Sequence, residues 1–155
     1  MLEASQKLHG QAEEGACAMG LLPGLGLAML LLAVPGILAL AAKFAFGPVP
    51  ADYHGEILSR AGVEPAPAVL TILGAVYKVL AGALAAVALA IAALVLVVAL
   101  GDARWPLLVV VAIALLVGGI AAFIMQGVER ATGVRTPWRR AAGLTVLVLA
   151  GALLA

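Results

Sequence analysis

The chain contains one long apolar stretch from Val69 to Leu100, which reads VLTILGAVYKVLAGALAAVALAIAALVLVVAL and in which Lys78 is the only charged residue. As a helix this stretch would measure about 48 Å, whereas the hydrocarbon core of a bilayer is about 30 Å thick. We interpret Tyr77 and Lys78 as the mark of a membrane interface, with an aromatic ring at headgroup depth and an ammonium group that reaches water. The sequence therefore predicts a span at residues 79–100, preceded by a helical or extended lead-in at residues 69–76.

The composition of the whole chain indicates the same class of protein. Hydrophobic residues make up 65% of the 155 residues and charged residues only 11%. Soluble domains carry about 25% charged residues, and a water-soluble protein of this size could not bury so much apolar surface. Disorder is excluded as well, because disordered chains are poor in hydrophobic residues. We therefore expect an all-α integral membrane protein.

Three further apolar segments complete a predicted four-helix membrane bundle, at residues 21–42, 105–126 and 137–155. The polar turn Gly101–Arg104 is short, so the spans on either side of it should form an antiparallel hairpin. Residues 1–20 form a polar N-terminal segment, and residues 21–155 form a single four-span domain. The run after residue 20 is too long for a signal-peptide core, which favours a retained helix.

Local signals mark the start of the third and fourth spans. Trp105 and Pro106 open the third, where a proline in the first turn leaves no extra hydrogen bond unmade. For the fourth span we expect Thr136 to cap the helix, Pro137 to take its first position, and Trp138 to anchor at the interface.

The distribution of basic residues predicts the orientation in the membrane. Cytoplasmic loops carry an excess of Lys and Arg. The loops at residues 43–78 and 127–140 are therefore predicted to be cytoplasmic and both termini to lie outside, in a bacterial inner membrane. Seven basic residues fall on the loop side, and two fall on the side of the termini: Lys43, Arg60, Lys78, Arg130, Arg135, Arg139 and Arg140 against Lys7 and Arg104.

The first loop contains a predicted amphipathic helix between Pro50 and Gly62. Glu56 and Arg60 are spaced for a favourable ion pair on one of its faces. Apolar side chains fall on another face, as expected for a helix that lies on the membrane surface. These apolar residues are Tyr53, Ile57, Leu58 and Ala61.

Asp52, His54 and Glu56 are the one cluster that suggests metal or acid–base chemistry. On a helix, however, His54 points about 200° away from Asp52, and the three side chains converge only in an extended segment. We favour a polar, solvated face of the surface helix. The alternative is a membrane enzyme with His54 and Glu56 in one cytoplasmic pocket.

Two residues in the apolar segments are further candidates. Lys78 could line a buried proton or anion site, because ionisable residues at membrane depth are often functional. We favour an anchor whose stem snorkels to the interface. Pro35, near the centre of the first span, is interpreted as a simple kink or, in the alternative, as a transport hinge.

The concentrated basic group Arg130, Arg135, Arg139 and Arg140 has two interpretations. These arginines could bind anionic lipid headgroups on the cytoplasmic face, or they could only set the topology. Two pairs of small residues, Gly82 with Ala86 and Gly118 with Ala122, are spaced for close helix contacts.

The order of these features resembles a group of small uncharacterised bacterial four-helix membrane proteins. The resemblance covers roughly residues 39–155 and rests on Tyr53-His54, on Tyr77-Lys78 and on the segment GVRTPW at residues 133–138. It implies a fold and a topology, and it transfers no catalytic residue.

The functional expectation is a non-catalytic accessory or scaffold subunit of a membrane complex, or a homo-oligomer. The alternative is a component of a transporter or channel for a small or amphiphilic solute. No nucleotide-binding loop, nucleophile elbow or metal-binding helix pattern appears in the sequence, so we predict no cofactor and no metal. The net charge of +1 gives no support for binding nucleic acid.

Overall fold

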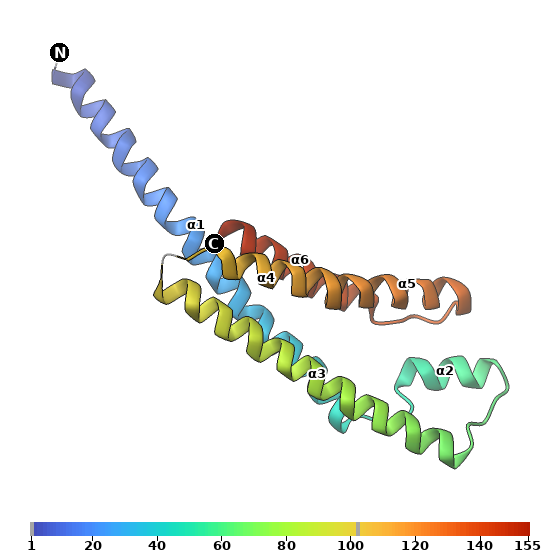
Figure 1. The fold of residues 1–155 in the computed structure, drawn as a ribbon. Helices are drawn as coiled ribbons and strands as arrows, with labels where there is room; N and C mark the ends of the chain where they lie inside the picture. Colours follow the sequence, from blue (N-terminus) through green and yellow to red (C-terminus); the bar gives the residue numbers. More distant parts are fainter. Residues whose placement is uncertain (1, 102) are drawn as a thin grey trace.

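The computed structural model describes residues 2–101 and 103–155, with side chains for residues 21–101 and 103–155. These residues form helices, turns and short loops, and none of the described residues lies in a β-strand. The chain is therefore all-helical, as predicted. Figure 1 shows the elements: α1 (Leu2–Phe46), α2 (Asp52–Arg60), α3 (Pro67–Leu100), α4 (Trp105–Ile113), the π-helical segment η1 (Ala114–Gly119), α5 (Ile120–Thr132) and α6 (Trp138–Leu154).

The long helices extend beyond the predicted spans. The lead-in before residue 79 is helical, and α3 is one continuous helix of 34 residues with a proline in its first turn. The first helix continues past residue 42 to Phe46, and the third rod continues past residue 126 to Thr132. The apolar pattern indicates which part of a helix suits lipid, but the backbone hydrogen bonds of the helix continue until a residue that favours a turn ends it. Helix α1 also passes through the exposed Pro35 without a break.

Three segments are long and apolar enough to cross a membrane: Leu21–Phe46, Pro67–Leu100 and Trp105–Thr132. The third is the continuous rod α4–η1–α5. Helix α6 has 17 residues, about 26 Å of helix, and is shorter than the three.

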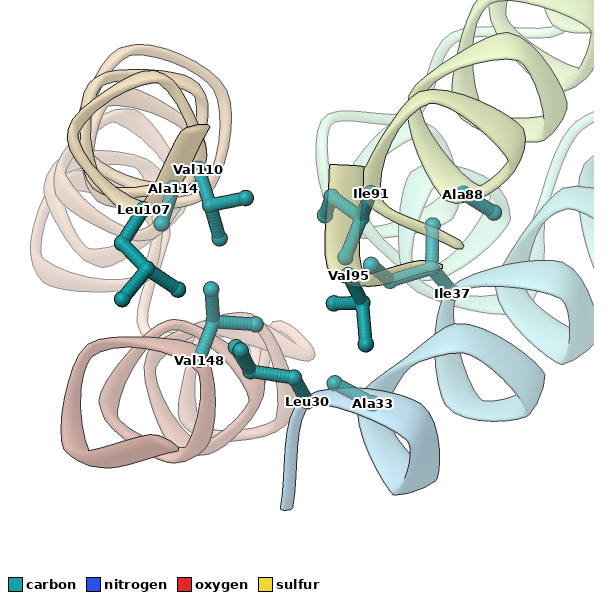
Figure 2. Close-up of a cluster of buried hydrophobic side chains, with 10 residues drawn as sticks. All are labelled: Leu30, Ala33, Ile37, Ala88, Ile91, Val95, Leu107, Val110, Ala114 and Val148. Carbon is teal, nitrogen blue, oxygen red and sulfur yellow. The ribbon is translucent and has the colours of Figure 1, made fainter. Parts of the chain in front are cut away.

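The main core lies where the four long rods meet. Helix α1 packs against both α3 and α6, while α4 and η1 close the other side against α6. Figure 2 shows the buried side chains converging from these ribbons. They are Leu30, Ala33 and Ile37 of α1, Ala88, Ile91 and Val95 of α3, Leu107 and Val110 of α4, Ala114 of η1, and Val148 of α6.

Glycines allow two close helix contacts in this core. Gly26 of α1 lies against the backbone of α6 at Gly151, and a Cβ on either residue would collide with the other helix. Gly118 of η1 lies directly against Thr145 of α6, so the predicted contact at Gly118 is confirmed. By contrast, no atom lies within 4 Å of a Cβ placed on Gly82, which faces outward with the exposed Ala86. That pair makes no helix contact within the described chain.

The two polar loops meet at one end of the bundle, and the α3–α4 turn lies at the other (Figure 1). A guanidinium nitrogen of Arg60 donates to the carbonyl oxygen of Gly133 at 3.5 Å, which joins α2 to the α5–α6 loop. We call this end, made of residues 43–67 and 132–140 with the start of α3, the loop end.

Candidate functional site at the loop end

An aromatic cluster holds α2 against the long helices. The ring of Tyr77 meets that of Phe44 edge to face, with centroids 5.5 Å apart, and Tyr77 is only 4% exposed. The surface helix packs over this position, so protein, and not lipid or water, surrounds the ring. Burial against protein does not fix the depth of the ring in a membrane, so the interface assignment of Tyr77 stays a prediction.

The hydroxyl group of Tyr77 connects three segments. It accepts a hydrogen bond from the backbone N–H of Ala51 at 3.2 Å and is also hydrogen-bonded to Nδ1 of His54. Because the tyrosine oxygen already accepts one hydrogen bond, its own proton is available for Nδ1. If the hydroxyl donates to Nδ1, the imidazole is neutral and carries its proton on Nε2, a tautomer assigned from the hydrogen-bond network.

The surroundings of α2 favour uncharged forms of its aromatic groups. Burial lowers the pKa of His54 below its ordinary value, because an imidazolium loses hydration there. Burial, followed by the neighbouring Tyr77, raises the pKa of Tyr53. Its hydrogen bond to Tyr77 directs His54 toward α3 and off the polar face of α2. The acidic side chains Asp52 and Glu56 pair with other residues, so the three side chains do not converge, as the helical spacing predicts. A helix diagram shows which residues share a face but not which face a neighbouring helix covers.

The two acidic residues of α2 remain outside this cluster. Asp52 pairs with Lys43 at 3.3 Å, and Glu56 pairs with Arg60 at 2.7 Å, as its spacing predicts. Among the described residues, no three of the types His, Cys, Asp and Glu gather as metal ligands.

Residues from both loops line an open charged pocket of about 810 Å³, a volume that includes solvent space at its mouth. It brings together two groups that are far apart in the sequence, the carboxylates of α2 and the arginines before and within the start of α6. Arg130 lies outside its lining. The lining residues are Lys43, Asp52, Tyr53, Glu56, Arg135, Thr136, Pro137, Arg139 and Arg140.

None of the three arginines of this pocket forms an ion pair among the described residues, although Arg139 is attracted to the nearby carboxylate of Glu129. Within residues 21–101 and 103–155, the ion pairs are Lys43–Asp52 and Glu56–Arg60. Arg139 lies over the ring of Trp138, with its guanidinium carbon 5.6 Å from the centroid. Such a contact orients an arginine without neutralising it.

The α5–α6 loop has an internal framework that positions these arginines. Gly133 ends α5 in the left-handed conformation, with φ +67°. The backbone N–H of Thr136 then donates to the carboxylate of Glu129 at 2.8 Å, and its hydroxyl donates to the carbonyl of Met125 at 2.9 Å. Thr136 thus turns back toward α5, and the prediction that it caps α6 is wrong.

An apolar groove approaches the charged pocket from the bundle interior. It lies between α3 and the rod η1–α5, with α1 and α6 as its floor, and holds about 530 Å³ including its open side. Leu40 lines both the groove and a small neck pocket. The neck in turn shares Lys43 and Arg140 with the charged pocket. The groove, the neck and the charged pocket therefore adjoin one another in space, in that order.

Other predicted site residues lie elsewhere. Lys78 is exposed on α3 and lines none of these pockets, although its neighbour Tyr77 is buried. The hydrogen bond between His54 and Tyr77 was not foreseen. No local pattern in the sequence indicates it, because the two residues lie 23 positions apart and meet only when α2 packs on α3.

The fold and the loop end thus define an all-helical protein with three apolar helices of membrane-spanning length and a charged pocket at one end. Comparison of the chain with protein-family models, curated proteins and solved structures finds no match.

Proposed function

We propose that this is an integral membrane protein that crosses a bacterial inner membrane four times, through α1, α3, the rod α4–η1–α5 and α6. The observation that supports insertion is the apolar outer surface of the long helices. Leu108 is 73% exposed and Phe123 is 76% exposed. In water such a surface would drive aggregation, whereas lipid solvates it. Helix α6 is about 26 Å long, so a modest local thinning of the bilayer lets it cross.

Within that membrane, the protein serves as a non-catalytic accessory or scaffold subunit, or as a homo-oligomer. The outward face of α3 supports this proposal, because Gly82 has open space beside it and Ala86 and Ala90 are exposed. Small residues on a lipid-facing surface let a second helix approach closely.

The test is the oligomeric state after purification in mild detergent. We expect a defined homo-oligomer or complex that Gly82→Leu or Ala86→Leu dissociates. Ala112→Leu, at an exposed alanine of α4, is the matched control and should have no effect. A strictly monomeric protein without a partner would contradict the scaffold proposal.

A component of a transporter or channel is the second candidate, favoured by the apolar groove that leads toward a charged pocket. Loaded vesicles containing the purified protein would then show a flux that Pro35→Ala reduces. Vesicles without any flux would exclude this candidate and leave the scaffold proposal untouched.

A further inference from the structure

The loop end places a charged pocket beside an apolar groove, and these match the polar and the apolar part of an amphiphilic molecule. The charged pocket offers the guanidinium groups of Arg135, Arg139 and Arg140, and none of them forms an ion pair among the described residues. Arg139 is attracted to the nearby carboxylate of Glu129, which leaves Arg135 and Arg140 as the two arginines of the pocket without a carboxylate neighbour in the described part of the chain. The adjoining groove is almost wholly apolar and follows α3 from Leu84 to Ile91, about 10 Å of helix.

We propose that groove, neck and charged pocket together bind one anionic phospholipid, with its phosphate on the arginines and one acyl chain in the groove. This inference rests on the proposed insertion in a membrane and assigns a specific site within it.

Charge complementarity selects the headgroup. Guanidinium groups bind phosphate oxygens through paired, charge-assisted hydrogen bonds. The acidic residues of the pocket do not oppose this, because Asp52 is paired with Lys43 and Glu56 with Arg60. The stacking of Arg139 on Trp138 orients one guanidinium before any ligand arrives.

The neck connects the two parts of the site. Arg140 lines both the neck and the charged pocket, and the next residue, Ala141, lines the groove. A phosphate held at Arg140 would therefore lie directly above the apolar channel. A soluble anion would use the arginines alone, whereas a lipid would use the groove as well, and this difference makes the proposal testable.

The experiment is native mass spectrometry of the detergent-purified full chain, titrated with palmitoyl-oleoyl phosphatidylglycerol. Phosphatidylcholine with the same chains and glycerol 3-phosphate are the comparison probes. We expect one phosphatidylglycerol per chain, bound about tenfold more tightly than either comparison probe. Equal binding of glycerol 3-phosphate would show that the groove takes no part and would overturn the proposal.

Matched variants separate this site from general attraction to anionic lipid. Arg140→Gln should weaken binding about tenfold, since it removes a charged hydrogen bond to phosphate. Arg130→Gln removes the same charge from the last turn of α5, outside the lining of the pocket, and should leave binding unchanged. Arg135→Gln repeats the test if Arg140→Gln does not fold. Equal losses in Arg130→Gln and the pocket variants would overturn the proposal.

A second pair of variants tests the groove. Ala121→Phe fills its wall and should weaken binding, whereas Ala112→Phe, at an exposed position of α4 outside the groove, should not. Unchanged lipid binding in Ala121→Phe would overturn the acyl-chain assignment. A changed oligomeric state, with lipid binding unaffected, would overturn it too and would indicate that a helix of another chain occupies the groove. Release of the protein from membranes by alkaline carbonate would refute membrane insertion itself, which is a separate failure.

Discussion

Among the described residues, the hydroxyl group of Tyr77 is the one polar atom that joins the α2 region to α3 by hydrogen bonds, through the Ala51 amide and the His54 ring. Tyr77→Phe would leave that buried amide without its acceptor. We expect the free energy of unfolding to fall by about 1–3 kcal/mol, measured by denaturant unfolding in detergent. Tyr53→Phe is the control, because the Tyr53 hydroxyl makes no hydrogen bond among the described residues and its loss should have a smaller effect. Equal losses would contradict this role of Tyr77.

His54 should make stability depend on pH. Its pKa is lowered in the folded protein, so between that pKa and about 6.5 the unfolded chain binds more protons than the folded one. Stability is therefore fully present above about pH 6.5 and is lost as the pH falls toward the folded pKa. The measurement is the melting temperature over a pH series. His54→Gln, which cannot be protonated, should flatten the acidic side of the curve, and an unchanged slope would refute this assignment.

Among the elements, the contact between η1 and α6 depends on one glycine of a neighbouring pair. A Cβ on Gly118 would collide with the hydroxyl of Thr145, which is itself held by a hydrogen bond to the carbonyl of Ala141 at 2.9 Å. Gly119 has no atom within 4 Å of the corresponding position. This difference gives a matched pair of substitutions within one helical turn.

We expect the two substitutions to change stability in opposite directions. Gly118→Ala should destabilise the protein by about 1–3 kcal/mol, because it overpacks a fixed contact. Gly119→Ala should stabilise it by up to about 1 kcal/mol, since alanine restricts the unfolded chain and favours a helix. Thermal unfolding of both variants in the same detergent decides the question, and destabilisation by Gly119→Ala would show that the two positions are packed alike.

For the whole molecule, the arrangement of the loops predicts which positions share a side of the membrane. The contact between Arg60 and Gly133 joins the two basic loops, and the α3–α4 turn lies at the opposite end of the bundle. With Cys17 replaced, single cysteines in the variants Ser59→Cys and Ala131→Cys should react with an impermeant thiol reagent from the cytoplasmic side only. Ala103→Cys should react from the outside only.

Lys78→Cys extends that experiment to the proposed anchor. Lys78 is exposed, and a lysine near the interface would extend its ammonium group toward the cytoplasmic headgroups. We expect labelling from the cytoplasmic side and a stability change within about 0.5 kcal/mol for Lys78→Leu, as for other surface substitutions. Protection from both sides would contradict the anchor, and labelling from outside would reverse the topology.

Local patterns in the chain were sufficient for the helical class, the α2 helix, the Glu56–Arg60 pair and the short α3–α4 turn. These features depend on composition and on contacts between near neighbours, which a single segment already contains. Packing between segments decided the rest. Burial of Tyr77, the inward direction of His54 and the pocket shared by Asp52 with Arg140 all require helices distant in sequence to lie side by side. Periodicity determines which residues share a face, but only the tertiary fold determines what that face contacts.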